Sequence, residues 1–368
     1  MQSRDVARLR LRALGIDRPS ATTPEAVVTH LGAVQAQDYP GALWSIGLRI
    51  VDATRADVER AVVERTIVRT WPMRGTLHFV PSADARWMLE LLAPRIIRSA
   101  AALHRQLELD AAALRRCRLL VSRALAREPV LSRGALYTAL QTGGVSTSSL
   151  RGIHIIRQLA MERLICQGPH AAKEPTFTLF DDWISTSRQL ERDDALGTLA
   201  ERYFRSHGPA ALRDFVYWTG LTVADAKIGL HLAQSSLERV ETDDGELWMS
   251  NERRTPGAPA SVAHLLPGFD ELMAGYKDRS AMVAPRHAGR VLSTANGVFA
   301  ATLVLDAQVC GTWRRSASAK AVVLEAAPFV RLTAAQKQSF DVPRARYANF
   351  LGAPVALRWI TRATAGRA

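Results

Sequence analysis

A repeated order of helices and strands constrains the fold of this 368-residue chain most strongly. The clearest copy is central: a helix over residues 111–127, a short helix over 132–140, a third helix ending near residue 163, and strands at 164–166 and 177–180. Helix, short helix, exposed helix and hairpin is the order of a winged helix-turn-helix. The central copy therefore predicts one such unit.

Two further copies of the order occur, with little sequence identity among the three. The copy after Arg192 predicts helices at 195–206, 210–218 and 222–234 and strands at 237–241 and 246–249 around the turn Asp243-Asp244-Gly245. The N-terminal copy predicts a helix from Pro24 through Val34, helices at 42–48 and 56–63, and strands at 67–71 and 76–80. Three units of one kind in one chain indicate an array rather than a single globule.

The last hundred residues follow a different pattern. It predicts strands at 298–305, 308–314, 321–326 and 355–360 and a helix over 333–350, with residues 251–260 as a linker. We therefore expect an α+β fold with four domains. These are winged-helix domain 1 (residues 1–108), winged-helix domain 2 (109–190), winged-helix domain 3 (191–255) and a small β-rich C-terminal domain (256–368).

The charge of the chain indicates a polyanionic partner. The formal net charge is +13, and all but five of the 48 basic residues are arginine. Codon bias can exchange lysine for arginine, but it does not create an excess of positive charge. Two basic blocks, 95–163 and 277–368, flank an acidic block at 181–252. This distribution is typical of a protein with one side facing nucleic acid, although a solvated basic surface gives the same pattern.

Several other classes of protein are disfavoured. No window approaches eighteen consecutive apolar residues, and the charged N-terminus lacks an apolar signal region, so we expect a cytoplasmic protein without a membrane span. Cys117, Cys166 and Cys310 are far apart and lack zinc-site spacing; we interpret them as small hydrophobic residues. The scattered histidines predict no metal site, and neither a Walker loop nor a GxSxG motif is present.

Two amides stand at the predicted end of the first helix. Gln35 and Gln37, followed by Asp38, come directly after an apolar stretch. On a helix, residues two apart diverge by roughly 200°, but at a fraying C-terminus both side chains can turn into one cleft. On this evidence alone, exposed helix-end glutamines are the simpler interpretation.

A resemblance gives the pair a function. The segments 31–49, 69–78, 208–220, 265–271, 275–279 and 311–315 resemble, in order, those of the AlkZ-type, YcaQ-related winged-helix DNA glycosylases. The resemblance implies three tandem winged helices in a C-shaped arrangement and a Gln-hydrophobic-Gln motif, which Gln35-Ala36-Gln37 matches. Because the YcaQ branch has Gln-x-Asp, the second glutamine places this chain nearer AlkZ.

The implied activity is that of a monofunctional DNA glycosylase. It would remove bulky N7-alkylguanine from double-stranded DNA, including interstrand crosslinks formed by a DNA-alkylating natural product, and leave an abasic site. Gln35 and Gln37 would hold the water and the sugar, with Asp38 adding negative potential. We expect no cofactor, no metal and no covalent lyase step, since the nearest lysine in sequence is Lys173. A monomer would suffice.

DNA contacts are expected from the two basic blocks and from one hairpin. A crosslinked guanine cannot readily enter a closed pocket, so an open basic channel with a hairpin probing a groove fits better. The turn at Asp306-Ala307 is the candidate probe, although an inert turn has the same sequence. Trp44, Trp71 and Trp218 are interpreted as core residues rather than stacking platforms. The predicted DNA-contacting residues are Arg115, Arg116, Arg151, Arg157, Gln308, Arg314 and Arg315.

A second hypothesis is a non-catalytic winged-helix transcriptional regulator. Tandem repeats in one chain could replace the two-fold dimer that such regulators use. The two hypotheses differ in what they do to DNA: a glycosylase leaves abasic sites in alkylated DNA, whereas a regulator retains undamaged DNA by sequence.

Overall fold

A computed structural model describes residues 1–368 except 173, 243–244, 253–261, 294–296, 318–321 and 361–368. The predicted linker at 251–260 and the first two residues of the Asp243-Asp244-Gly245 turn thus lie largely outside the described residues. Two compact units are present: residues 1–58, 196–218 and 222–368 form unit 1, and residues 59–195 and 219–221 form unit 2. This is a different grouping from the four domains expected above, which stay a prediction.

Unit 2 is built on short antiparallel strands. Its strand order is β3-β2-β5-β6-β4, and helix α5 (Ser82–Ser99) packs against β2. The β2–β3 hairpin turns through Arg74 and Gly75, both with positive φ. The strands are β2 (Ile67–Met73), β3 (Thr76–Pro81), β4 (Leu131–Ser132), β5 (Ile165–Gln167) and β6 (Thr176–Leu179).

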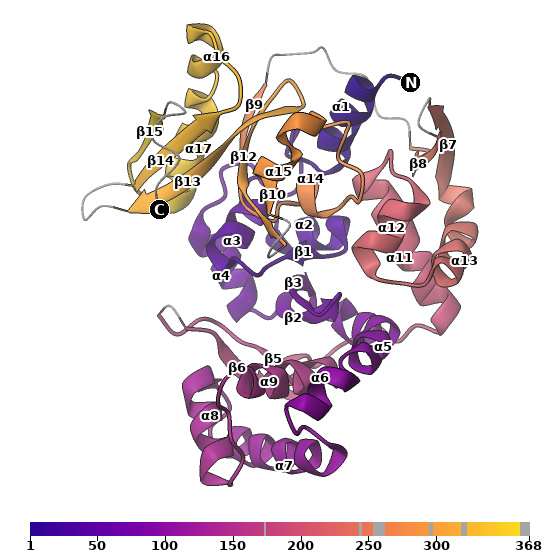
Figure 1. The fold of residues 1–368 in the computed structure, drawn as a ribbon, viewed down its shortest axis with the longest axis vertical. Helices are drawn as coiled ribbons and strands as arrows, with labels where there is room; N and C mark the ends of the chain where they lie inside the picture. Colours follow the sequence, from indigo (N-terminus) through magenta and orange to yellow (C-terminus); the bar gives the residue numbers. More distant parts are fainter. Residues whose placement is uncertain (173, 243–244, 253–261, 294–296, 318–321, 361–368) are drawn as a thin grey trace. The chain divides into compact units, whose positions relative to one another are not determined.

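The helices of unit 2 confirm the central copy of the pattern. Helix α7 (Ala111–Arg127) begins after Asp110, whose carboxylate accepts from Ala113 N, and α8 (Arg133–Thr142) begins after Ser132, whose hydroxyl accepts from Ala135 N. Helix α9 (Arg151–Met161) buries one face, and Figure 1 shows α7, α8 and α9 with the β5–β6 pair. The predicted order of three helices and two strands is present. The other helices here are α6 (Ala101–Gln106) and α10 (Phe180–Trp183).

The N-terminal part of unit 1 corrects one prediction. Helix α2 (Pro24–Leu31) ends at Gly32, whose φ of 79° departs from helical geometry, so a helix through Val34 is wrong. The chain then enters β1 (Val34–Gln35). The other elements are α1 (Ser3–Ala13), α3 (Tyr39–Gly47) and α4 (Arg55–Val63), the last of which crosses the boundary between the units.

The copy after Arg192 has the predicted helices and hairpin. Thr222 caps α13 (Val223–Ala233), since its hydroxyl accepts from Asp225 N. The rings of Tyr203, Phe204, Phe215 and Trp218 pack together without solvent exposure. The remaining elements are α11 (Arg192–His207), α12 (Leu212–Thr219), the 3-10 helix η1 (Gln234–Ser236), β7 (Leu237–Thr242) and β8 (Gly245–Ser250).

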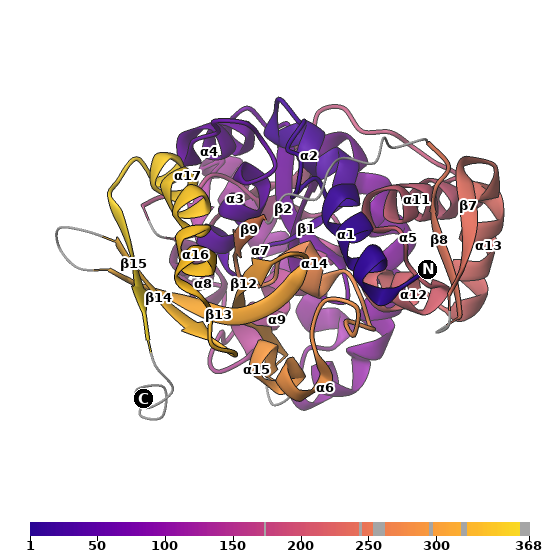
Figure 2. The same ribbon diagram turned by 90° about the horizontal axis from the view of Figure 1, so that it is seen from above.

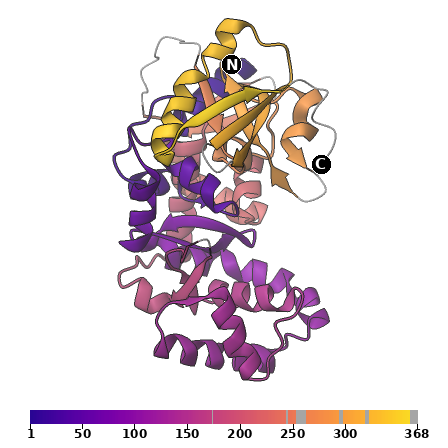
Figure 3. The ribbon, with the colours of Figure 1, turned by 90° about the vertical axis from the view of Figure 1, so that its left-hand side faces the viewer.

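A five-stranded mixed sheet completes unit 1. Its order is β15-β14-β13-β12-β9, with β14 and β15 parallel and the other neighbours antiparallel. Helix α17 (Asp341–Leu351) packs on β15 and β9, as Figures 2 and 3 show. The strands are β9 (Ala263–Leu266), β12 (Ala301–Leu305), β13 (Gln308–Ala317), β14 (Val322–Pro328) and β15 (Val355–Trp359).

Short elements connect this sheet. They are α14 (Glu271–Ala274), η2 (Pro285–His287), α15 (Ala288–Val291), α16 (Ala334–Gln338), β10 (Leu292–Ser293) and β11 (Val298–Phe299). The β12–β13 turn uses Asp306 and Ala307, both in the left-handed region at φ 51° and 64°, as a two-residue hairpin requires. None of the helices among the described residues is long and apolar enough to cross a bilayer.

Candidate active site

The side-chain amides of the two glutamines meet where β1 ends. Gln35 Nε2 donates to Gln37 Oε1 at 2.6 Å. Gln35 is the last residue of β1, and Gln37 lies beyond the strand at a bend, where its amide meets that of Gln35. Ala36 between them is fully buried, Gln35 is 6% exposed and Gln37 is exposed. The pair thus extends from the core of unit 1 to its surface.

A buried carboxylate holds the strand that carries Gln35. Gln35 N donates to Glu271 Oε1 at 3.1 Å, and Trp218 Nε1 donates to Glu271 Oε2 at 2.9 Å. His207 Nε2 lies 3.3 Å from the same oxygen. Glu271 has no solvent exposure, so water does not screen these contacts. The carboxylate fixes the backbone of Gln35 against α11, α12 and α14.

A second buried carboxylate anchors α3, which follows the glutamines. Asp270 accepts from both terminal nitrogens of Arg49, at 2.9 and 3.1 Å, and from Ser45 Oγ at 2.7 Å. Burial opposes ionisation of Asp270, but the charge and hydrogen bonds of Arg49 outweigh burial and lower the pKa of this carboxyl group. Asp270 therefore stays ionised and ties α3 to the start of α14.

A cavity of about 420 Å³ lies beside Asp38, the residue after Gln37. Arg314 and Arg315 of β13 also line it, so the structure brings three predicted site residues to one cavity. Arg314 Nε donates to Glu325 Oε2 at 2.5 Å. Burial raises the pKa of Tyr347, another lining residue; Arg315 opposes this shift and Asp38 adds to it.

Gln308 of the proposed DNA-probing hairpin contacts its own unit. Its Nε2 donates to Ala281 O at 2.7 Å and to Ala307 O at 3.3 Å. Ala307 is buried, while Asp306 is exposed. At this turn, Asp306 is exposed to solvent, while the Gln308 side chain is held against the backbone at Ala281. A role of Gln308 in DNA contact stays a prediction.

The four predicted arginines of unit 2 differ in exposure. Arg115 and Arg116 are exposed on α7, and Arg116 also donates to Gly143 O at 2.5 Å. Arg151 is partly buried, donates to Leu107 O and lies 3.9 Å from the Glu108 carboxylate. Arg157 is partly buried beside Gly75, and burial lowers its pKa. The first two are therefore the better placed to reach phosphates.

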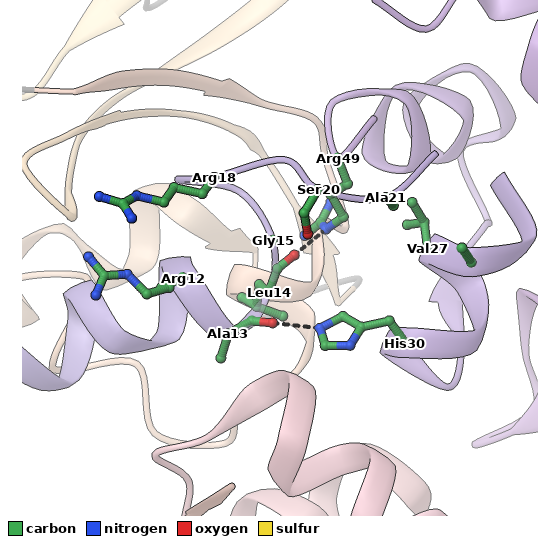
Figure 4. A pocket seen from close by; sticks show the side chains of 11 residues that line it. Arg12, Ala13, Leu14, Gly15, Arg18, Ser20, Ala21, Val27, His30 and Arg49 are labelled. Carbon is green, nitrogen blue, oxygen red and sulfur yellow. Dashed lines mark hydrogen bonds between the residues drawn. The ribbon is translucent and has the colours of Figure 1, made fainter. Parts of the chain in front are cut away.

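A larger cavity, of about 520 Å³, lies between α1 and α2. Figure 4 shows Arg12 and Arg18 on one side of it and His30 opposite, with His30 Nε2 2.7 Å from Ala13 O. Arg49 also lines this cavity, and its Nε donates to Leu14 O at 2.7 Å. Since Arg49 is already paired with Asp270, this cavity carries less positive charge than its arginines indicate.

The structure tests the predicted burial of three tryptophans and three cysteines. Trp44, Trp71 and Trp218 are at most 5% exposed, which confirms them as core residues. Cys117 and Cys166 are buried as expected, whereas Cys310 is only partly buried. In the part of the chain that the structure describes, His, Cys, Asp and Glu side chains form no group of three or more that could hold a metal ion.

Comparison with known proteins decides the family. The family profile described as DNA glycosylase AlkZ-like matches residues 28–350. The chain belongs to the AlkZ-like DNA glycosylase family. It is accordingly a DNA glycosylase, which confirms the resemblance drawn from the sequence; a non-catalytic regulator is not favoured.

Two matched proteins support this assignment. The interstrand DNA cross-link repair glycosylase of Streptomyces sahachiroi is 29% identical over 324 residues, which are 80% of this chain and 82% of that protein. The solved structure of the Streptomyces sahachiroi DNA glycosylase AlkZ aligns with a TM-score of 0.80 at 23% identity, over 98% of this chain and 100% of that chain. The α+β fold class is confirmed.

Sequence reasoning missed the buried supports of the site. Glu271, the Arg49–Asp270 pair and Tyr347 were not among the predicted site residues, although 265–271 was one of the segments that resemble the family. A signal existed: two adjacent acidic residues, Asp270 and Glu271, follow the apolar strand β9 in a stretch otherwise rich in apolar residues. Buried carboxylates in such a place require partners, which the fold supplies.

Proposed function

We propose that the chain hydrolyses the N-glycosidic bond of bulky N7-alkylguanine in double-stranded DNA and leaves an abasic site. Interstrand crosslinks from a DNA-alkylating natural product are included, because the Streptomyces sahachiroi relative is named for their repair. The biological role would be DNA repair or self-resistance. The observation that carries the proposal is the hydrogen-bonded amide pair of Gln35 and Gln37. Buried Glu271 accepts from the backbone N–H of Gln35, and Gln37 is exposed to solvent.

The chemistry suits neutral amides. Alkylation at N7 makes guanine a cation, so the C1′–N9 bond can break with its electron pair on the departing base, which becomes neutral. Water oxygen then bonds to C1′ and releases its proton to solvent. Amide oxygens can accept from that water or face the cationic sugar, and preorganised dipoles of this kind lower the barrier. Asp38 would add negative potential near the sugar.

Phosphate contacts complete the proposal. Arg115, Arg116, Arg151 and Arg157 of unit 2 and Gln308, Arg314 and Arg315 of unit 1 would contact DNA, with the β12–β13 turn as a groove probe. Each of the three helix-and-hairpin copies would act as a winged helix, in a C-shaped arrangement. We further propose a monomer that acts in the cytoplasm without a cofactor. These features remain predictions to be tested on DNA complexes.

The decisive experiment removes both amides. The Q35A/Q37A variant should bind DNA within about threefold of wild type, while single-turnover release of a bulky N7-alkylguanine falls by at least about a hundredfold, the loss typical of a preorganised transition-state group. Abasic sites are scored as strand breaks after heat or alkali. Gln338→Ala, an exposed glutamine on α16 of the same unit, is the matched control and should release the base normally. Release unchanged in the double variant would refute the assignment.

A further inference from the structure

The cavity beside Asp38 has the size and lining of a small-molecule site. Its volume of about 420 Å³ falls in the usual range for ligand pockets. Its walls include five aromatic side chains, Trp44, Phe269, Phe299, Trp313 and Tyr347. The indole Nε1 of Trp313 donates to Leu266 O at 2.9 Å, which fixes its ring. Rigid aromatic walls of this kind suit a flat, π-rich ligand.

One carboxylate faces this aromatic lining. Asp38 is exposed and precedes α3, yet its side chain makes no capping hydrogen bond with the helix. A Cβ atom at Gly41 would lie 2.5 Å from Asp38 Oδ2, so the absence of a side chain at Gly41 leaves room for the carboxylate. Asp38 also acts electrostatically on Tyr347, whose phenol lines the same cavity. The carboxylate therefore has a defined position beside the ligand space.

The cationic residues of the cavity lie on β13. Arg314 is 67% exposed at its side chain and paired with Glu325, and Arg315 is exposed. A ligand that carries a flat base with N–H donors and a flanking phosphate would match the aromatic walls, the carboxylate and the arginines together. A nucleotide has this combination.

We propose that this cavity receives the base of the damaged nucleotide, with Asp38 accepting from guanine N1–H and N2–H₂. Adenine presents an acceptor at N1, so the same carboxylate disfavours it. Asp38 is thus a specificity-determining residue that reads the base, beyond any general negative potential. The inference rests on the proposed glycosylase function and concerns monoadducts, since a crosslinked guanine cannot leave the stack in the same way.

The test compares two lesions in DNA. Release of 7-methylguanine and of 3-methyladenine is measured under single-turnover conditions for wild type and variants. Asp38→Asn should lower the preference for 7-methylguanine about tenfold or more, because one bidentate base contact is lost. Asp5→Asn makes the same chemical change at an exposed position on α1 and should leave the preference unchanged.

A second variant separates geometry from charge. Gly41→Ala keeps the charge of Asp38 but displaces its carboxylate, since the new Cβ would lie 2.5 Å from Oδ2. Alanine is well tolerated in a helix, so folding should not suffer. Base reading predicts reduced preference in this variant as well, whereas a purely electrostatic role of Asp38 predicts none.

The outcomes distinguish this inference from the proposed function. If the preference is unchanged in both Asp38→Asn and Gly41→Ala while Q35A/Q37A is inactive, the base-reading inference is wrong and the glycosylase proposal stands. If Q35A/Q37A still releases 7-methylguanine, the catalytic proposal itself fails. Reduced preference in both variants, with normal release by Asp5→Asn, supports the inference.

Discussion

The glutamine segment of unit 1 and the arginine-bearing helix α7 of unit 2 are held in opposite ways. Gln35 sits on a backbone fixed by Glu271, a carboxylate without solvent exposure that also binds Trp218. Arg115 and Arg116 stand exposed on α7. Under the proposed function, the glutamines act at a sugar, which requires groups fixed to fractions of an ångström. The arginines would contact phosphates, and such a contact tolerates a mobile side chain. The first region should therefore respond to mutation through buried supports, and the second through charge alone.

The largest effect is expected at Glu271. In Glu271→Ala, the Gln35 and Trp218 N–H groups lose a buried acceptor, at about 1–3 kcal/mol each, so the free energy of unfolding should fall by about 4 kcal/mol. Urea denaturation measures this loss.

The control for Glu271 is a partly exposed glutamate of the same unit. Glu201 pairs with Arg205 four residues later on α11, with about a third of each side chain exposed. Glu201→Ala should cost no more than about 0.5 kcal/mol. If both variants lost the same free energy of unfolding, the buried Glu271 contacts would stabilise the protein no more than a surface ion pair does.

A smaller effect is expected from pH. Burial lowers the pKa of His264 on β9 to about 4 from its ordinary value of 6.5, with Arg346 also lowering it and Asp17 and Asp270 opposing. The unfolded chain then takes up a proton below pH 6.5 that the folded chain refuses until about pH 4. Stability should thus fall as pH falls through this window, by at most about 2 kcal/mol between pH 7.5 and 5.

Replacing the histidine tests the cause. Urea denaturation of His264→Gln should lack this part of the pH dependence, while wild type shows it. If the free energy of unfolding of the variant still fell with pH as in wild type, groups other than His264 would cause the pH dependence.

The smallest effect is expected in the exposed arginines. R115A/R116A should weaken DNA binding about tenfold and reduce the slope of log K against log salt by about 2, with normal release at saturating DNA. Fluorescence anisotropy at several salt concentrations measures both. Arg239→Ala, whose guanidinium lies within 3.2 Å of the carboxylates of Glu241 and Glu246, should bind normally. A changed release rate in R115A/R116A with unchanged affinity would contradict a role of these arginines in DNA binding alone.

Local patterns predicted most of the secondary structure. Asp110, Ser132 and Thr222 each cap a helix that the periodicity placed correctly, and the Asp306-Ala307 turn joins the expected strands. Caps and tight turns depend on a few neighbouring residues, so they are readable from the sequence. There are two exceptions. Apolar continuity predicted helix at residues 32–35, where Gly32 ends it. The single helix predicted over 333–350 is two helices, α16 and α17, which are separated at residues 339–340.

The sequence alone determined the repeated helix-and-hairpin order, the basic character and the Gln-Ala-Gln motif. The first and last depend on residues close together in the chain, and the charge depends only on composition. Only the tertiary structure decided how the motif is held in place. It ended the first helix at Leu31, placed Gln35 at the end of β1 with its side-chain amide bonded to that of Gln37, and brought Glu271, 236 residues away, to the Gln35 backbone N–H. Such contacts depend on the packing of the whole unit, which no local pattern encodes.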